Sequence, residues 1–206
     1  MVKDHPIFLE SMSFIRSKLS THNFNFLEVK VLERLIHTSG DFEIQNLLKF
    51  SDRACEIAIQ AIRNGAPILT DTQMASVAIE SMAKQTGNLV FPAKKWIKNN
   101  KLLSLTKTAY GIEKGWIQLS EKFFGDNSPI VVFGSSPTAL ENLLDILEKR
   151  YNKPSLIVGM PVGFIGVENS KKRLINSRYP YIILRSTRGG AAMAAATINA
   201  LLRESI

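Results

Sequence analysis

His37 is the side chain that the sequence places best for proton transfer. It falls in the last turn of a helix expected over 26–37, directly after the apolar pair Leu35 and Ile36. The negative end of a helix dipole attracts a positively charged imidazolium, which would suit a proton donor working near neutral pH. A histidine that only caps the end of the helix fits the same position.

Two loops that follow apolar runs could bind anions. After the run 130–133, a glycine and a serine open an expected helix, where backbone N–H groups would face a ligand. After the run 181–184 the chain reads Arg-Ser-Thr-Arg-Gly-Gly, and arginines there could hold carboxylates through both oxygens. An ordinary helix N-cap and surface arginines are the alternative interpretations. The candidate residues are Gly134, Ser135, Arg185, Arg188, Gly189 and Gly190.

Metal-ion, nucleotide and nucleophilic chemistry have little support in the sequence. There is no His-Glu-x-x-His, no pair of cysteines and no aspartate-rich loop, so we expect no bound metal. The turn after residue 133 lacks the lysine of a P-loop. Thr138 stands where a dinucleotide fingerprint or a nucleophile elbow needs its closing glycine. Cys55, the single cysteine, lies among apolar residues of an expected helix and is predicted to belong to the core.

The elements that would position these residues alternate between helices and short buried strands. Apolar residues recur at helical spacing over 5–19, 26–37 and 51–64, with Gly40 ending the second helix and Ser51 capping the third. Apolar runs predict strands over 67–71, 89–91, 130–133, 156–158 and 181–184. Further helices are expected over 73–84, 108–119, 136–150 and 190–203.

Strands that are apolar on both faces and separated by helices indicate a parallel sheet covered on both sides. We therefore expect the α/β class: a three-layer α/β/α sandwich with a mostly parallel sheet of about five strands, preceded by N-terminal helices. The glycine-rich stretch 159–166 is interpreted either as a tight crossover or as a place where backbone approaches something flat.

Length and composition limit the class of protein. With 206 residues, 45% of them hydrophobic, the chain suits one domain over 1–206. No uninterrupted apolar stretch approaches the roughly 18 residues of a membrane span, and no apolar signal region follows the N-terminus. A single cysteine fits a reducing compartment. We therefore expect a cytoplasmic protein that makes no use of a membrane.

The charge balance favours a polyanionic partner. Lys and Arg number 26 against 18 Asp and Glu, which leaves a net charge of +8. The excess gathers over 92–108, which has five lysines and no acid, and over 171–188. A solvated surface is the alternative interpretation. Few aromatic side chains accompany the lysines near Trp96, so we expect no nucleic-acid partner.

Five segments of the chain form a recognisable series. They are Ile-His-Thr-Ser-Gly-Asp-Phe-Glu at 36–43, Gly-Ala-Pro-Ile-Leu-Thr-Asp-Thr-Gln-Met at 65–74, Phe-Gly-Ser-Ser-Pro-Thr-Ala-Leu at 133–140, Gly-Met-Pro-Val-Gly-Phe-Ile-Gly at 159–166 and Arg-x-x-x-Gly-Gly at 185–190. Taken together they resemble the precorrin-8X methylmutase family of cobalamin biosynthesis, whose members are also described as cobalt-precorrin-8 methylmutases. Each motif alone is weak, but they occur in the family's order and cover nearly the whole chain.

This resemblance implies an isomerase that moves a methyl group from ring carbon 11 to ring carbon 12 of precorrin-8 or cobalt-precorrin-8. The product would be hydrogenobyrinic acid or its cobalt counterpart, cobyrinic acid, and no cofactor would be needed. The resemblance places the role of proton donor and acceptor on His37, and substrate binding on Ser11. Where family members have a substrate-binding arginine, this chain has Lys107, which keeps the charge but loses the two-pronged geometry.

The resemblance also implies a polycarboxylate tetrapyrrole substrate and a homodimer with sites near the interface. The small residues of the helix over 190–203 could pack against a second copy or against the sheet of their own chain. The residues do not indicate whether the substrate carries cobalt. A non-catalytic tetrapyrrole-binding carrier is the alternative function: it would use the same basic loops but would not need His37.

Overall fold

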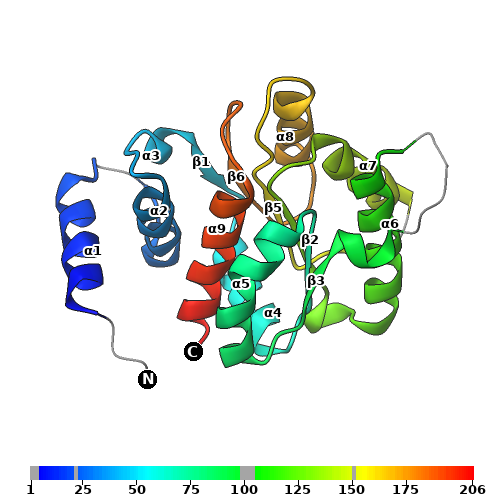
Figure 1. Ribbon diagram of the computed structural model, residues 1–206, viewed down its shortest axis with the longest axis horizontal. Coiled ribbons are helices and arrows are strands. Elements are labelled where there is room, and N and C mark those ends of the chain that lie inside the picture. The colour runs from blue at the N-terminus through cyan, green and yellow to red at the C-terminus, as the bar shows by residue number, and fades with distance from the viewer. Residues whose placement is uncertain (1–4, 21–22, 98–104, 150–151) are drawn as a thin grey trace.

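A six-stranded sheet forms the centre of the computed structural model, which describes residues 5–20, 23–97, 105–149 and 152–206 (Figure 1). The edge strand β1 runs antiparallel to its neighbour β6, and the other neighbouring strands are parallel. Across the sheet the order is β1 (Leu48–Phe50), β6 (Tyr181–Leu184), β5 (Leu156–Gly159), β4 (Ile130–Phe133), β2 (Ile68–Thr70) and β3 (Val90–Pro92).

Helices cover both faces of this sheet. In Figure 1, α1 stands in blue at the left, and α2 lies between it and the red α9. The first face carries α1 (Pro6–Lys18), α2 (Phe26–Ser39), α4 (Ala54–Arg63), α5 (Gln73–Thr86) and α9 (Ala191–Glu204). The second carries α6 (Lys107–Lys122), α7 (Pro137–Lys149) and α8 (Val167–Ile175). Three shorter turns are α3 (Ile44–Leu47), η1 (Ala93–Trp96) and η2 (Gly125–Asn127).

Two hydrophobic cores lie on opposite sides of the sheet because successive strand residues point to opposite faces. In β4, Ile130 and Val132 belong to the core under α9, whereas Val131 and Phe133 belong to the core under α6 and α7. All four side chains are fully buried. The expected three-layer α/β/α sandwich is therefore confirmed.

The expected count of about five strands is corrected to six by β1. This strand has only three residues, and the Lys49 side chain in its centre is exposed. Such a short edge strand gives no apolar run in the sequence, and its partner β6 lies more than 130 residues away. Helix α8 was also missed, because its sequence Val-Glu-Asn-Ser-Lys-Lys-Arg-Leu-Ile is mostly polar.

The expected N-cap at Ser51 is wrong. Helix α4 begins at Ala54, and its N-cap residue Arg53 makes no side-chain capping bond. Ser51 instead extends the pairing of β1 with β6: its hydroxyl accepts the N–H of Tyr181 at 2.9 Å, and its own N–H donates to the Tyr181 carbonyl at 3.0 Å. The Ser51 hydroxyl, which a helix cap would have needed, is therefore engaged in the pairing of β1 with β6.

Other local predictions are confirmed. Gly40 ends α2 in the left-handed conformation, with a φ of 66°, and its N–H donates to the Ile36 carbonyl at 2.8 Å. Ser136 precedes α7, and its hydroxyl accepts the N–H of Ala139 at 3.2 Å. Within the described residues, no helix is both long and apolar enough to cross a membrane.

The carboxyl ends of the parallel strands meet at one edge of the sheet. From there β2 leads into α5 on the first face, whereas β4 leads into α7 on the second face. Ligands of open α/β sheets bind where neighbouring strands diverge in this way. Here that place lies between β2 and β4, at Asp71 and Gly134.

Candidate functional site

Ser11 and His37 lie in hydrogen-bond contact, although 26 residues separate them in the chain. The Ser11 hydroxyl oxygen is 2.9 Å from Nδ1 of His37. The pairing of α1 with α2 creates this contact, since Ser11 lies in the middle of α1 and His37 in the last turn of α2. The ring of Phe8 meets the imidazole edge-on, with 5.5 Å between centroids. The imidazole is thus oriented by one polar and one aromatic neighbour.

This contact leaves the other ring nitrogen of His37 available. The side chain is exposed, and no hydrogen bond from the described part of the chain reaches Nε2. When the serine hydroxyl donates to Nδ1, the neutral ring carries its hydrogen on Nε2. When Nδ1–H donates to the serine oxygen, Nε2 is an acceptor. The pair can therefore present either a hydrogen-bond donor or a hydrogen-bond acceptor to a bound molecule.

The loop after β6 meets the end of α2 through its two arginines. The guanidinium of Arg188 forms an ion pair with Asp41, four residues after His37. Arg185 donates to the carbonyl of Asn46 at 2.6 Å. Both arginines remain exposed. The fold thus brings the predicted arginine loop and the predicted histidine to the same end of the molecule.

Lys171 holds this loop from the other side. Its side chain is only 2% exposed, and its ammonium donates to the carbonyls of Ser186 at 2.8 Å and Arg188 at 2.6 Å. Burial lowers the pKa of Lys171 to about 8. Ser186 adopts the left-handed conformation, with a φ of 64°. The available signal for Lys171 was its place on the apolar face of α8, between Val167 and Leu174, but that helix was not predicted.

Gly189 and Gly190 allow the same loop to lie against the end of β5. A Cβ on Gly189 would stand 2.1 Å from the Met160 carbonyl oxygen, and φ there is 159°. The N–H of Gly190 donates to that carbonyl at 2.9 Å. Close backbone packing therefore explains Gly189, and a φ of 123° explains Gly190. Their predicted contact with substrate stays a prediction.

An internal carboxylate occupies the predicted anion cradle at the start of α7. Oδ2 of Asp71, the residue after β2, accepts the N–H of Ser135 at 2.7 Å and that of Ser136 at 2.9 Å. Gly134 lies against α9, where an added Cβ would stand 2.6 Å from the Cα of Ala191. The substrate roles of Gly134 and Ser135 remain predictions. Ser135 is exposed, and no hydrogen bond within the described residues engages its hydroxyl, which could therefore contact a substrate.

Asp71 was not predicted as a site residue, although its place at the end of the strand expected over 67–71 was a signal. The residue is 5% exposed, and within the described chain its Oδ1 has no hydrogen-bond partner. Burial raises the pKa of the Asp71 carboxyl, and the backbone N–H groups of the turn offset this only in part.

Lys107 lies apart from the histidine, as the first residue of α6 on the second face of the sheet. Its side chain is exposed. The preceding Thr106 caps the helix by accepting the N–H of Ala109 at 3.2 Å, and its hydroxyl is 3.1 Å from that of Thr138. No contact within the described residues joins Lys107 to the Ser11–His37 pair. Lys98 and Lys101 of the lysine run lie outside the described residues.

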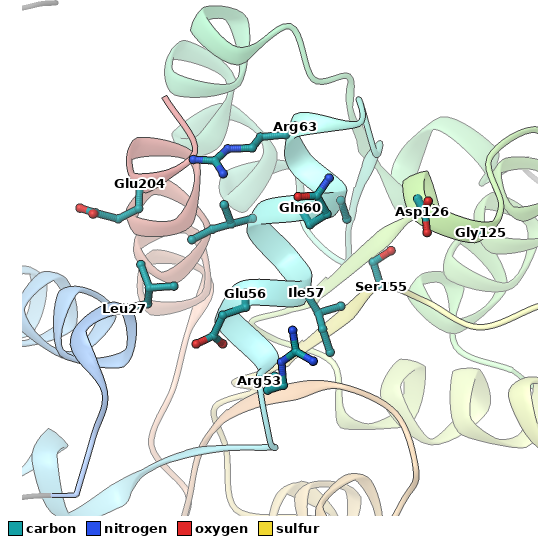
Figure 2. Close-up of a pocket in the computed structure, with 12 residues that line it drawn as sticks. Leu27, Arg53, Glu56, Ile57, Gln60, Arg63, Gly125, Asp126, Ser155 and Glu204 are labelled. Atoms are coloured by element: carbon teal, nitrogen blue, oxygen red, sulfur yellow. The ribbon is translucent and has the colours of Figure 1, made fainter.

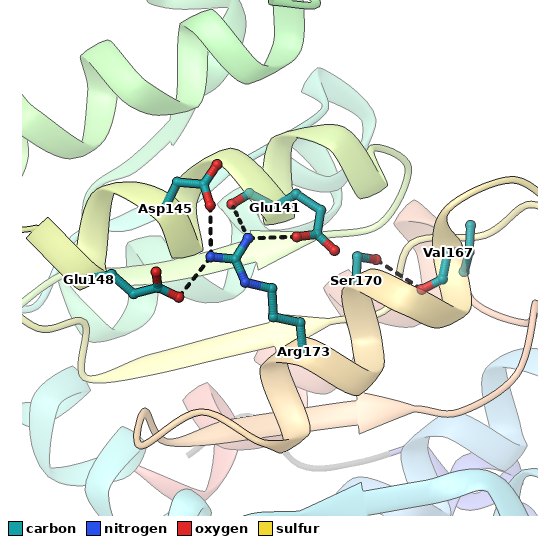
Figure 3. Close-up of polar contacts among 6 residues, drawn as sticks. All are labelled: Glu141, Asp145, Glu148, Val167, Ser170 and Arg173. Carbon is teal, nitrogen blue, oxygen red and sulfur yellow. Dashed lines mark hydrogen bonds and ion pairs between the residues drawn. The ribbon is translucent and has the colours of Figure 1, made fainter.

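Part of the second basic cluster is used inside the fold. Figure 3 shows the Arg173 guanidinium of α8 among three acidic side chains of α7, each at 2.7 Å: Glu141, Asp145 and Glu148. Lys171 is buried and Arg173 is half-buried, and the contacts of both cations stabilise the packing around α8. The exposed positive charge near the predicted site therefore comes from the arginine loop.

A cavity of about 550 Å³ lies beside α4, away from the predicted site residues (Figure 2). Arg53, Glu56 and Arg63 line it, together with Asp126 and Ser155, which precede β4 and β5. It therefore opens at the amino ends of these strands, opposite to the edge where open α/β sheets bind ligands. Its lining contains none of the predicted site residues.

The described residues do not offer a metal centre. Among them, no group of three or more His, Cys, Asp or Glu side chains is placed to hold an ion. Cys55 is fully buried, and burial raises the pKa of its thiol. Its prediction as a core residue is confirmed.

The chain is similar to known proteins over nearly its whole length. The family model described as precorrin-8X methylmutase matches residues 6–204. A cobalt-precorrin-8 methylmutase of Leptospira interrogans is 31% identical, over 94% of this chain and 90% of its own. A precorrin-8X methylmutase of Pseudomonas aeruginosa is 34% identical, over 96% and 94%. A crystal structure of precorrin-8X methylmutase from Thermus thermophilus superposes with a TM-score of 0.85 at 29% identity, covering 98% of each chain. The chain belongs to the precorrin-8X methylmutase family, the methyl-transferring isomerases of cobalamin biosynthesis.

Proposed function

We propose that this methylmutase moves the methyl group on ring carbon 11 of precorrin-8, or of its cobalt form, to ring carbon 12, with His37 exchanging the proton. The hydrogen bond between Ser11 and His37 is the observation that carries this proposal. It orients an exposed imidazole whose second nitrogen is available to a substrate. Family membership supplies the reaction class, and this pair supplies a group able to assist it.

The proposed step is a rearrangement in which no electron pair leaves the substrate. Nε2 of His37 donates a proton to the macrocycle, which draws electron density from the ring and eases migration of the methyl group. The bond to carbon 11 breaks as the bond to carbon 12 forms, and the proton then returns to His37. The donor is the imidazolium form, in which both ring nitrogens carry hydrogen; after transfer from Nε2 the neutral ring keeps its hydrogen on Nδ1, so the Ser11 oxygen accepts from Nδ1–H in both states.

The carboxylates of the proposed substrate would meet the exposed arginines at the same end of the sheet. Arg188 uses one amino group for Asp41, and Arg185 uses one for Asn46. Each guanidinium therefore keeps other N–H groups for a ligand. Lys107 would reach a further carboxylate as a single positive charge. The net charge of +8 would also draw such a substrate to the protein.

Replacing His37 by alanine tests the catalytic role. General acid–base catalysis contributes roughly 10²- to 10⁴-fold, so we expect kcat to fall by about that factor while affinity for the corrin product stays within about threefold. The assay is an anaerobic absorbance time course with precorrin-8 and then with its cobalt form. His5→Asn is the matched control, because it replaces an exposed histidine at the start of α1 and keeps a side chain able to cap the helix.

The same assay separates the enzyme from a carrier. Wild-type protein that binds the tetrapyrrole without spectral conversion would favour the carrier and leave His37 as a helix cap. Ser11→Ala keeps the imidazole but removes its orienting contact, so we expect a loss of kcat of about tenfold, smaller than for His37→Ala. Equal activity of the Ser11 variant and the wild type would contradict the role given to this pair.

A homodimer remains part of the proposal. Large apolar side chains are exposed on two helices of the first face: Ile7 and Phe14 on α1, Met74 and Val77 on α5. Such surfaces commonly become buried in association. Light scattering of the purified protein tests this, and a monomer at micromolar concentration would refute it. Cytoplasmic location, and the expectation of no nucleic-acid partner, stay predictions.

A further inference from the structure

Asp71 connects two strand ends at the point where the sheet diverges. Its backbone N–H donates to the Val132 carbonyl of β4 at 2.9 Å, while its carboxylate accepts the N–H groups of Ser135 and Ser136. One residue after β2 therefore determines the conformation of the turn after β4. The side chain is buried, and no described cation forms an ion pair with it.

A carboxylate is a costly choice for closing a turn. Burial of a charge without a paired cation is unfavourable, and Oδ1 has no hydrogen-bond partner in the described chain. A neutral side chain with one acceptor oxygen would satisfy the same two N–H groups. What the carboxylate adds is strength, because N–H groups that donate to an ionised oxygen form stronger hydrogen bonds than those that donate to a neutral amide.

Contacts between hydroxyl groups connect this turn to the start of α6. The Ser136 hydroxyl is 3.1 Å from that of Thr138, which in turn is 3.1 Å from that of Thr106. Thr106 is the N-cap of α6, and Lys107 is the first residue of that helix. Side-chain contacts thereby join the N-termini of α6 and α7, and Asp71 holds the turn at the α7 end of this series of contacts.

We propose that Asp71 is a positioning residue: through the Gly134–Ser136 turn and the Thr138–Thr106 contact, it sets the start of α6 and so directs Lys107 toward a carboxylate of the substrate. This inference rests on the proposed function and adds the residue that orients one of its binding groups.

The test compares the steady-state kinetics of Asp71→Ala, Asp71→Asn and Thr138→Val. Loss of a charge-assisted contact is expected to raise KM of Asp71→Ala by about tenfold, with kcat within about threefold, because His37 is untouched. Asn keeps an oxygen that can accept both N–H groups but loses the charge, so it should restore part of the affinity. Thr138→Val should raise KM by about threefold to tenfold with the turn intact.

The double variant Asp71→Ala/Thr138→Val reports whether the two residues act through one chain of contacts. We expect the KM of the double variant to be no higher than that of Asp71→Ala alone, since the Asp71 change already disconnects the turn. Additive effects would overturn the proposal, as would a fall in kcat at unchanged KM. Asp145→Asn is the control: within the described residues this acid of α7 pairs with Arg173 of α8, and its replacement should leave KM unchanged.

Two further outcomes of these experiments also test the proposal. If Asp71→Ala does not fold, an unchanged KM in Thr138→Val overturns the proposal by itself. If wild-type protein binds the corrin product but does not convert precorrin-8, the proposed function fails, and the same variants are then compared by titration with that product. Equal dissociation constants for wild type, Asp71→Ala and Thr138→Val would overturn the positioning role as well.

Discussion

Replacing Lys171 by methionine should change how the stability of this protein depends on pH. The ammonium of Lys171 is buried and donates to the carbonyls of Ser186 and Arg188, with no carboxylate in contact within the described chain. Burial therefore lowers its pKa from an ordinary 10.5 to about 8. Methionine has a similar length and no charge, so it removes this titration with little change of volume.

The direction of this pH dependence follows from how many protons the folded and the unfolded states bind. Between pH 8 and 10.5 the unfolded chain still binds the Lys171 proton, whereas the folded chain has lost it. The free energy of unfolding therefore rises with pH in this window, and the cost of burying the charge is fully present only below pH 8. Two to three pKa units at about 1.4 kcal/mol each give a gain of about 3 kcal/mol.

Urea unfolding at steps from pH 7 to pH 10.5 measures this effect as a difference between wild type and Lys171→Met, in which the titration of other groups cancels. The difference should grow in favour of wild type by about 3 kcal/mol across the window. Lys172→Met, which changes the exposed neighbour, should show no such growth. Parallel stability curves for wild type and Lys171→Met would refute the assignment of a buried, weakly basic amine.

Two other substitutions address packing. Gly189→Ala would place a methyl group 2.1 Å from the Met160 carbonyl oxygen, so we expect a loss of about 3 kcal/mol in urea unfolding, and a loss below about 1 kcal/mol would contradict the close approach. Arg173→Met leaves Glu141, Asp145 and Glu148 without their shared cation. It should lower the free energy of unfolding by about 1–2 kcal/mol, less at high salt, without altering KM; a changed KM would show that α8 influences the site.

The local pattern of apolar residues predicted most of the layers. Runs such as 130–133 are buried on both faces, and helix ends such as Gly40 depend only on neighbouring residues. Elements whose stability comes from distant partners were missed. The three residues of β1 need β6 to form a strand, and α8 is polar because its cations contact the acids of α7 and the loop after β6.

For the candidate site, the sequence by itself determined which groups are present: a histidine in the last turn of a helix, two arginines beside paired glycines, and an excess of positive charge. The order of the five motifs along the chain was enough to indicate the family. Only the tertiary structure decided which groups meet. Ser11 reaches His37 because α1 packs on α2, and Asp71 fills the turn at 134–136 because β2 and β4 are neighbours. Contacts between residues far apart in the chain depend on how layers pack, and no local pattern encodes that geometry.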